Sequence, residues 1–143
     1  MGQSDDTILR AKAHEQIRKM KEHFHDPEDQ MEKLYEHIGD ARIVLLGEAS
    51  HGTHEYYTWR SRISKELIRN KGFNMICVEG DWPDCYRINR YVRSYTQADV
   101  SALQVLKEFH RWPTWMWANW EIAALMEWLK KHNEGKDFRG QTG

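Results

Sequence analysis

The stretch Ile43-Val44-Leu45-Leu46-Gly47 is an apolar run closed by a glycine, and Met75-Ile76-Cys77-Val78-Glu79 repeats this apolar character farther along the chain. Short continuous apolar runs are typical of strands that are buried on both faces of a parallel sheet. Between the two runs, apolar residues recur at helical spacing, at Tyr56, Trp59, Ile63 and Leu67. A strand, a helix and a second strand form a βαβ unit, whose parallel strands end at the same edge. The sequence therefore predicts an α/β fold with helices packed on a small parallel sheet.

Helices are also predicted on both sides of this unit. A helix before it is expected to begin at Asp26-Pro27, with the aspartate as N-cap, and to end at Gly39. Further helices are expected over residues 83–95, over 99–106 with Asp99 as N-cap, and over 119–133, the last beginning at Asn119. One more helix is expected nearest the N-terminus, with its apolar face at Ala13, Ile17, Met20 and Phe24.

Charge and hydropathy narrow the classes of partner. The chain has 143 residues, the length of one domain, with 21 basic and 22 acidic side chains and a formal net charge of −1. This balance does not supply the basic surface that binds nucleic acid. The longest aliphatic run is far shorter than the ~20 apolar residues that cross a bilayer, and the acidic N-terminus is unlike a signal peptide. We therefore expect a cytoplasmic protein that binds neither nucleic acid nor membrane.

Polar residues follow both predicted strands, at the edge where parallel sheets bind ligands. The first run leads into Glu48-Ala49-Ser50-His51-Gly52, and the second ends at Glu79. Arg60 shares a helical stripe with Ile63, so it is expected to face the sheet and to need an acidic partner such as Glu48 or Glu79. A structural ion pair between helix and sheet is the alternative interpretation.

His51 is the candidate general base because imidazole titrates near neutral pH and a carboxylate on its second nitrogen would fix its tautomer. The alternative is a loop histidine that caps the following helix. Ser50 is a weaker candidate for a nucleophile, since its surroundings do not match Gly-x-Ser-x-Gly.

A metal site is the competing hypothesis. His51, His54 and Glu55 have a spacing that would place three ligands on one helical face, but Gly52 interrupts that helix. We therefore rank a site of histidines and carboxylates second and expect no cofactor. Cys77 and Cys85 match no zinc motif, and Cys77 is expected to be a small buried hydrophobe.

Tryptophans gather within nine residues around Pro113, at Trp112, Trp115, Trp117 and Trp120. Such a cluster suits the wall of a pocket for a large apolar ligand. Packing in the core is the favoured interpretation, because the neighbouring helix needs an inner face.

Three separated motifs resemble the erythromycin esterase family. They are Gly47-Glu48-Ala49-Ser50-His51-Gly52 with Glu55 and Arg60, then Glu79-Gly80-Asp81-Trp82, then Pro113-Thr114-Trp115-Met116-Trp117-Ala118-Asn119. The resemblance implies a metal-independent hydrolase that opens macrolide lactones or related esters with a histidine-activated water. It places the base on His51, with Glu48, Arg60 and Glu79 at the other site positions, and a small-molecule ester or lactone as substrate.

The resemblance also implies a longer protein than this chain, with further site histidines in a part not present here. We expect residues 1–143 to be one domain, the N-terminal portion of an erythromycin esterase-like domain, with a helical region over 1–34 and the family-like region over 35–143. Because two strands leave both sheet edges unpaired, a C-terminal portion is expected to complete the fold, and the chain alone to expose apolar surface and show little activity. A non-catalytic, shortened family member is the alternative.

Overall fold

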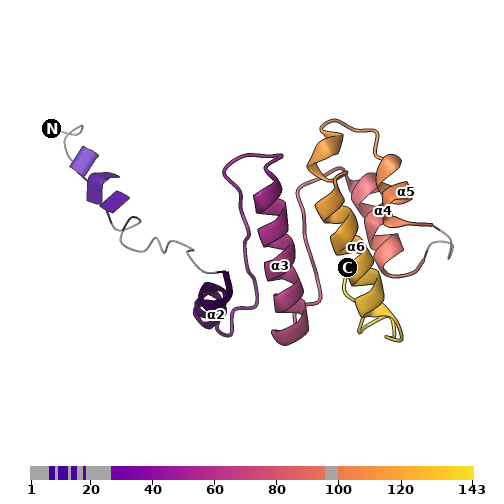
Figure 1. Ribbon diagram of the computed structural model, residues 1–143, viewed down its shortest axis with the longest axis horizontal. Coiled ribbons are helices and arrows are strands. Elements are labelled where there is room, and N and C mark those ends of the chain that lie inside the picture. The colour runs from indigo at the N-terminus through magenta and orange to yellow at the C-terminus, as the bar shows by residue number, and fades with distance from the viewer. Residues whose placement is uncertain (1–6, 9, 13, 16–17, 19–26, 96–99) are drawn as a thin grey trace. The chain divides into compact units, whose positions relative to one another are not determined.

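The computed structural model describes residues 7–8, 10–12, 14–15, 18, 27–95 and 100–143. The chain divides into two compact units, residues 1–41 and 42–143. The apolar positions expected to mark the first helix, and the expected N-cap Asp26, lie outside the described residues. The helices labelled in Figure 1 are α2 (Pro27–Ile38), α3 (His54–Asn70), α4 (Trp82–Val92), α5 (Ala102–Lys107) and α6 (Trp120–Asn133). A 3-10 turn, η1 (Thr114–Met116), lies between α5 and α6.

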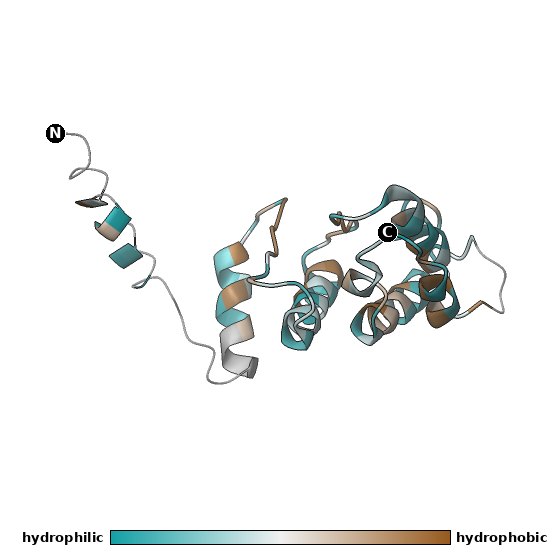
Figure 2. Cartoon of the chain, turned by 90° about the horizontal axis from the view of Figure 1, so that it is seen from above, coloured by the Kyte–Doolittle hydropathy of each residue, from teal (hydrophilic) through white to brown (hydrophobic). Residues whose placement is uncertain are grey.

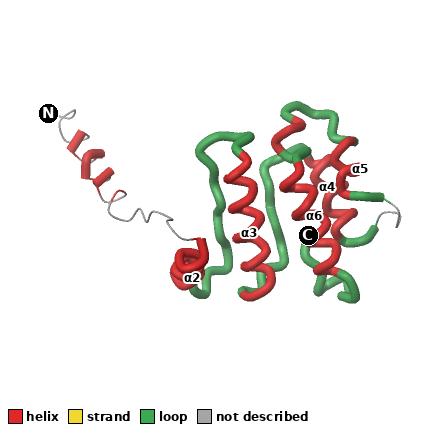
Figure 3. Tube along the Cα trace, viewed as in Figure 1, coloured by secondary structure: helices red, strands yellow, loops and turns green. Residues whose placement is uncertain are grey.

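The predicted parallel sheet is wrong, because the described residues form helices and loops and contain no strand (Figure 3). Residues 43–46 and 75–79 lie in loops on either side of α3. Ile43 is 78% exposed and Leu45 90% exposed, and the loop after α2 is coloured as hydrophobic in Figure 2. Cys77, expected to be buried, is exposed as well. An apolar run becomes a buried strand only where neighbouring strands pair with its backbone, and that pairing is not encoded in the run itself.

One short backbone pairing does occur beside α3. The Ile76 N–H donates to the Gly143 carbonyl at 3.0 Å, and the Gly143 N–H donates to the Asn74 carbonyl at 3.4 Å. The C-terminal residues are held there by Asn133, whose side-chain amide donates to the Val92 and Thr142 carbonyls at 2.8 and 2.7 Å. The end of α6 is thereby tied to the loop that follows α3.

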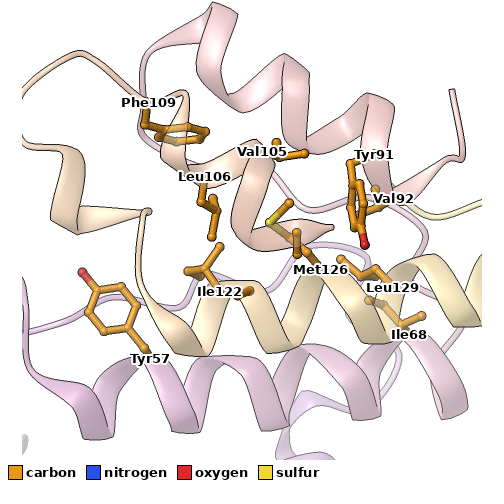
Figure 4. Close-up of a cluster of buried hydrophobic side chains, with 12 residues drawn as sticks. Tyr57, Ile68, Tyr91, Val92, Val105, Leu106, Phe109, Ile122, Met126 and Leu129 are labelled. Atoms are coloured by element: carbon orange, nitrogen blue, oxygen red, sulfur yellow. The ribbon is translucent and has the colours of Figure 1, made fainter. Parts of the chain in front are cut away.

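The core of residues 42–143 lies between four helices, with α6 in contact with α3, α4 and α5 (Figure 4). Ile122, Met126 and Leu129 recur at intervals of four and three residues, so α6 presents one continuous apolar face. Each fully buried side chain of this size stabilises the fold by about 1.5–3 kcal/mol. The other core residues labelled in Figure 4 come from α3, α4, and α5 with the residues after it: Tyr57, Ile68, Tyr91, Val92, Val105, Leu106 and Phe109.

Local signals explain where several helices begin and end. The Asn119 side chain accepts the Ile122 N–H at 3.0 Å, which confirms the predicted N-cap of α6. The α2 helix ends at Ile38, and Gly39 follows with a φ of +51°, as predicted for a C-terminal glycine. The N-cap of α5 is Ser101, which forms a capping box with Gln104, whereas Asp99 lies outside the described residues. No described helix is both long enough and apolar enough to cross a membrane.

Candidate active site

Glu48 lies at the centre of the candidate site, in the loop before α3. One of its carboxylate oxygens binds Nδ1 of His51, and the other lies 2.8 Å from a guanidinium nitrogen of Arg60. The Glu48 side chain is only 8% exposed. The structure therefore supplies the acidic partner that Arg60 requires, and a single carboxylate holds both the histidine and the arginine.

His51 is open to solvent although its Nδ1 is engaged. Its side chain is 50% exposed, and its ring lies against Trp115, with the two ring centroids 6.4 Å apart and their planes tilted by 57°. Because Nδ1 binds Glu48, Nε2 is the nitrogen available for proton transfer. A histidine that acted only as a helix cap would not need this arrangement, and the N-cap of α3 is Thr53.

Gly52 allows the loop to turn beside Trp115. Its φ is +82°, a conformation that L side chains rarely adopt, and a Cβ added there would lie 3.2 Å from Trp115 Cζ3. Its N–H donates to the hydroxyl of the buried Tyr57 at 3.4 Å. A glycine between His51 and α3 is therefore required by both the backbone conformation and the close aromatic neighbour.

Arg60 extends from α3 over two aromatic rings. Its guanidinium carbon lies 4.8 Å from the centroid of Tyr57 and 5.8 Å from that of Trp117. Aromatic faces attract such a cation. Arg60 is thus held by charge on one side and by packing on the other.

Glu79 joins this region through its backbone. Its carbonyl accepts the indole N–H of Trp117 at 2.7 Å, while the residue as a whole is exposed. Within the described residues its carboxylate forms neither a hydrogen bond nor an ion pair. Trp117 therefore connects Glu79 to Arg60, although the carboxylate itself holds neither His51 nor Arg60.

The proposed metal ligands do not converge. His54, the first residue of α3, binds Glu121 of α6 through Nδ1, whereas His51 binds Glu48. In the part of the chain that the structure describes, no group of three histidine, cysteine or acidic side chains is arranged to hold a metal ion. The two histidines thus form separate pairs with different carboxylates.

The tryptophan cluster is less buried than predicted. Trp112 is 84% exposed and Trp120 73% exposed, so the interpretation as core packing is wrong for both. Trp117 does pack against the core, while Trp115 forms the aromatic wall beside His51. The tryptophan cluster itself could be recognised in the sequence. The contacts of Trp115 with His51 and of Glu121 with His54 could not, because more than sixty residues separate the partners in each pair.

Comparison with known proteins identifies the family. A profile of the erythromycin esterase family matches residues 68–141, more than half of the chain. The chain belongs to the erythromycin esterase family. An Escherichia coli protein named erythromycin esterase type II is 28% identical over 112 residues, which cover 78% of this chain and 25% of the relative. No solved structure matches the chain.

This member of the erythromycin esterase family spans about a quarter of the length of that relative. The profile match includes Glu79 and the tryptophan cluster, whereas Glu48, His51 and Arg60 precede it. The contacts of Glu48 are therefore evidence for a site that is independent of the family match.

Proposed function

We propose that the chain carries the base of an ester hydrolase, with His51 as the residue that activates water. The observation that supports this proposal most strongly is the binding of His51 Nδ1 and Arg60 by the same buried carboxylate of Glu48. Such a carboxylate fixes the imidazole tautomer and stabilises the imidazolium that forms when the histidine accepts a proton. Membership of the erythromycin esterase family supports the same reaction class.

In the proposed reaction, His51 Nε2 takes one proton from a water molecule while the water oxygen attacks the ester carbonyl carbon. The resulting tetrahedral intermediate collapses with cleavage of the bond to the alcohol oxygen. The imidazolium returns its proton to that oxygen, so that ester and water become carboxylic acid and alcohol. General-base assistance of this kind typically contributes about 10²–10⁴-fold to the rate.

Arg60 serves this reaction as a positioning residue, because its guanidinium contacts Glu48 and its side chain is only 21% exposed. We propose that Glu79, whose carboxylate is exposed, positions the attacking water from the loop anchored by Trp117. The exposed indoles of Trp112 and Trp120 favour a substrate with an apolar or ring-bearing surface. A carboxylic ester or lactone of that kind is the proposed substrate, with macrolide lactones as the narrower hypothesis.

The test compares His51→Gln with a matched variant, His110→Gln, at an exposed histidine outside the site. Hydrolysis of an aryl ester and of erythromycin would be measured with this chain, and with a chimera in which it replaces the matching quarter of the Escherichia coli relative. We expect turnover in the chimera, a loss of at least about 10²-fold for His51→Gln, and no change for His110→Gln. A folded chimera without turnover, or equal rates for both variants, would contradict the proposal and favour a non-catalytic protein.

A further inference from the structure

A second group of basic side chains gathers near the C-terminal ends of α3 and α6, whereas His51 precedes the N-terminal end of α3. We call it the basic cluster and define it as Lys65 and Arg69 of α3, Trp128 and His132 of α6, and Lys136 after α6. It shares no residue with the site around Glu48.

The basic cluster is built around the indole of Trp128. The Arg69 guanidinium carbon lies 4.9 Å from the ring centroid and Lys65 Nζ lies 5.9 Å from it. The His132 ring stacks on the same indole, with centroids 5.0 Å apart and planes 14° from parallel. Lys136 Nζ lies 2.6 Å from His132 Nε2, a contact in which the ammonium donates when that ring nitrogen carries no proton.

The cations of the basic cluster, Lys65, Arg69 and Lys136, form no ion pair among the described residues. Burial, together with the charges of Lys136 and Arg69, lowers the pKa of His132, and burial and Arg69 lower the pKa of Lys65. The dipoles at the two helix ends favour cations there, but only weakly. The positive charge of the cluster is therefore not neutralised by a direct ion pair.

We propose that the basic cluster binds a phosphate-class dianion, either free phosphate or a phosphate monoester. The guanidinium of Arg69 supplies paired donors that match two phosphate oxygens, and the two ammonium groups supply point charges from α3 and from the segment after α6. A dianion also favours protonation of His132, and because Nε2 faces Lys136 Nζ, this protonation requires the ammonium to turn from the ring toward the dianion. The proposal does not depend on the ester hydrolase activity.

Inorganic phosphate is the first probe, titrated into the full chain at constant ionic strength maintained with sodium chloride. We expect saturable binding by calorimetry and a rise in the pKa of His132, followed through its imidazole proton resonance in NMR spectra. Arg69→Gln should weaken binding at least about tenfold, because it removes the charged, two-pronged donor. Lys131→Gln removes the same charge from an exposed side chain of α6 outside the cluster and should leave the affinity unchanged.

Arg69→Lys keeps the positive charge but removes the paired donors, so it should bind phosphate with intermediate affinity. Thermal melts show whether each variant is folded. Phenyl phosphate and phosphatidylcholine vesicles containing phosphatidic acid then distinguish a soluble monoester from a lipid headgroup, and binding of either through Arg69 supports the proposal. The proposal is wrong if the folded wild-type chain binds no phosphate compound saturably. It is also wrong if Lys131→Gln and Arg69→Gln weaken binding equally, since that result indicates charge screening alone.

Discussion

Trp115 lies against His51, with ring centroids 6.4 Å apart, although 64 residues separate them in the sequence. This contact brings the 3-10 turn before α6 to the loop before α3, so one wall of the candidate site comes from the second half of the chain. The ring also restricts how the imidazole can rotate once Glu48 holds Nδ1.

Trp115→Ala should lower kcat/KM for ester hydrolysis about tenfold in the chimera, because the imidazole loses its neighbour and its fixed orientation. Phe138→Ala is the control, since Phe138 is an exposed aromatic residue to which the proposed site assigns no role. We expect the melting temperature to fall little in either variant. If the two substitutions lower kcat/KM equally, the contact with His51 is not what matters.

Arg60→Met should destabilise the protein by about 2 kcal/mol, because the buried Glu48 carboxylate loses its cation. A double-mutant cycle adds Glu48→Gln, alone and combined with Arg60→Met. Urea unfolding measures the free energy of unfolding of each variant. We expect the double variant to be more stable than the sum of the single changes predicts. Strict additivity would show that the ion pair contributes nothing to stability.

Gly52→Ala should destabilise the fold by about 1–2 kcal/mol, since the residue has a positive φ and lies close to Trp115. Gly72→Ala is a matched control with a φ of +74° and open space around it. Both variants share the backbone strain, so only Gly52→Ala should shift the indole N–H resonance of Trp115. Identical shifts in the two spectra would disprove the steric role of Trp115.

Tyr91 should make the stability of the folded chain depend on pH in the alkaline range. Its hydroxyl donates to Glu127 at 2.7 Å, and burial followed by this hydrogen bond raises the Tyr91 pKa far above its usual value. A raised pKa means that the neutral phenol is favoured by folding, so this stability is present below about pH 10 and is lost as the pH rises further. Tyr91→Phe should lower stability by about 1 kcal/mol at pH 7 and flatten the alkaline fall. A fall of the same slope in both proteins, measured by urea unfolding at pH 9 to 11, would contradict this assignment.

The two cysteines should differ in reactivity. Cys77 is exposed, whereas burial and the charges of Asp84 and Asp81 raise the pKa of Cys85. Because the thiolate is the reactive form, Cys85 should react with iodoacetamide more slowly than Cys77 at pH 8.5. Peptide mass spectrometry of the folded chain measures both rates, and unfolding in urea should make them similar. A faster reaction at Cys85 in the folded chain would be inconsistent with its burial.

Local sequence signals determined most of the helices. Helical spacing, the N-cap Asn119 and the terminal Gly39 were sufficient because their interactions lie within a few residues. The same holds for Glu48 and His51, whose spacing of three residues allows their contact within one loop. The requirement of Arg60 for an acidic partner also followed from its place on the helical stripe, whereas the catalytic roles of these residues remain predictions.

Tertiary structure decided whether the apolar runs became strands and which side chains surround His51. Residues 43–46 and 75–79 have the composition of buried strands, yet a strand exists only when neighbouring segments pair with its backbone, and the described residues supply only the pairing of Gly143 with Asn74 and Ile76. Likewise, Trp115 reaches His51 and Glu121 reaches His54 only because α6 packs against α3. Contacts between distant residues depend on how whole helices pack, and a local sequence pattern carries no information about that packing.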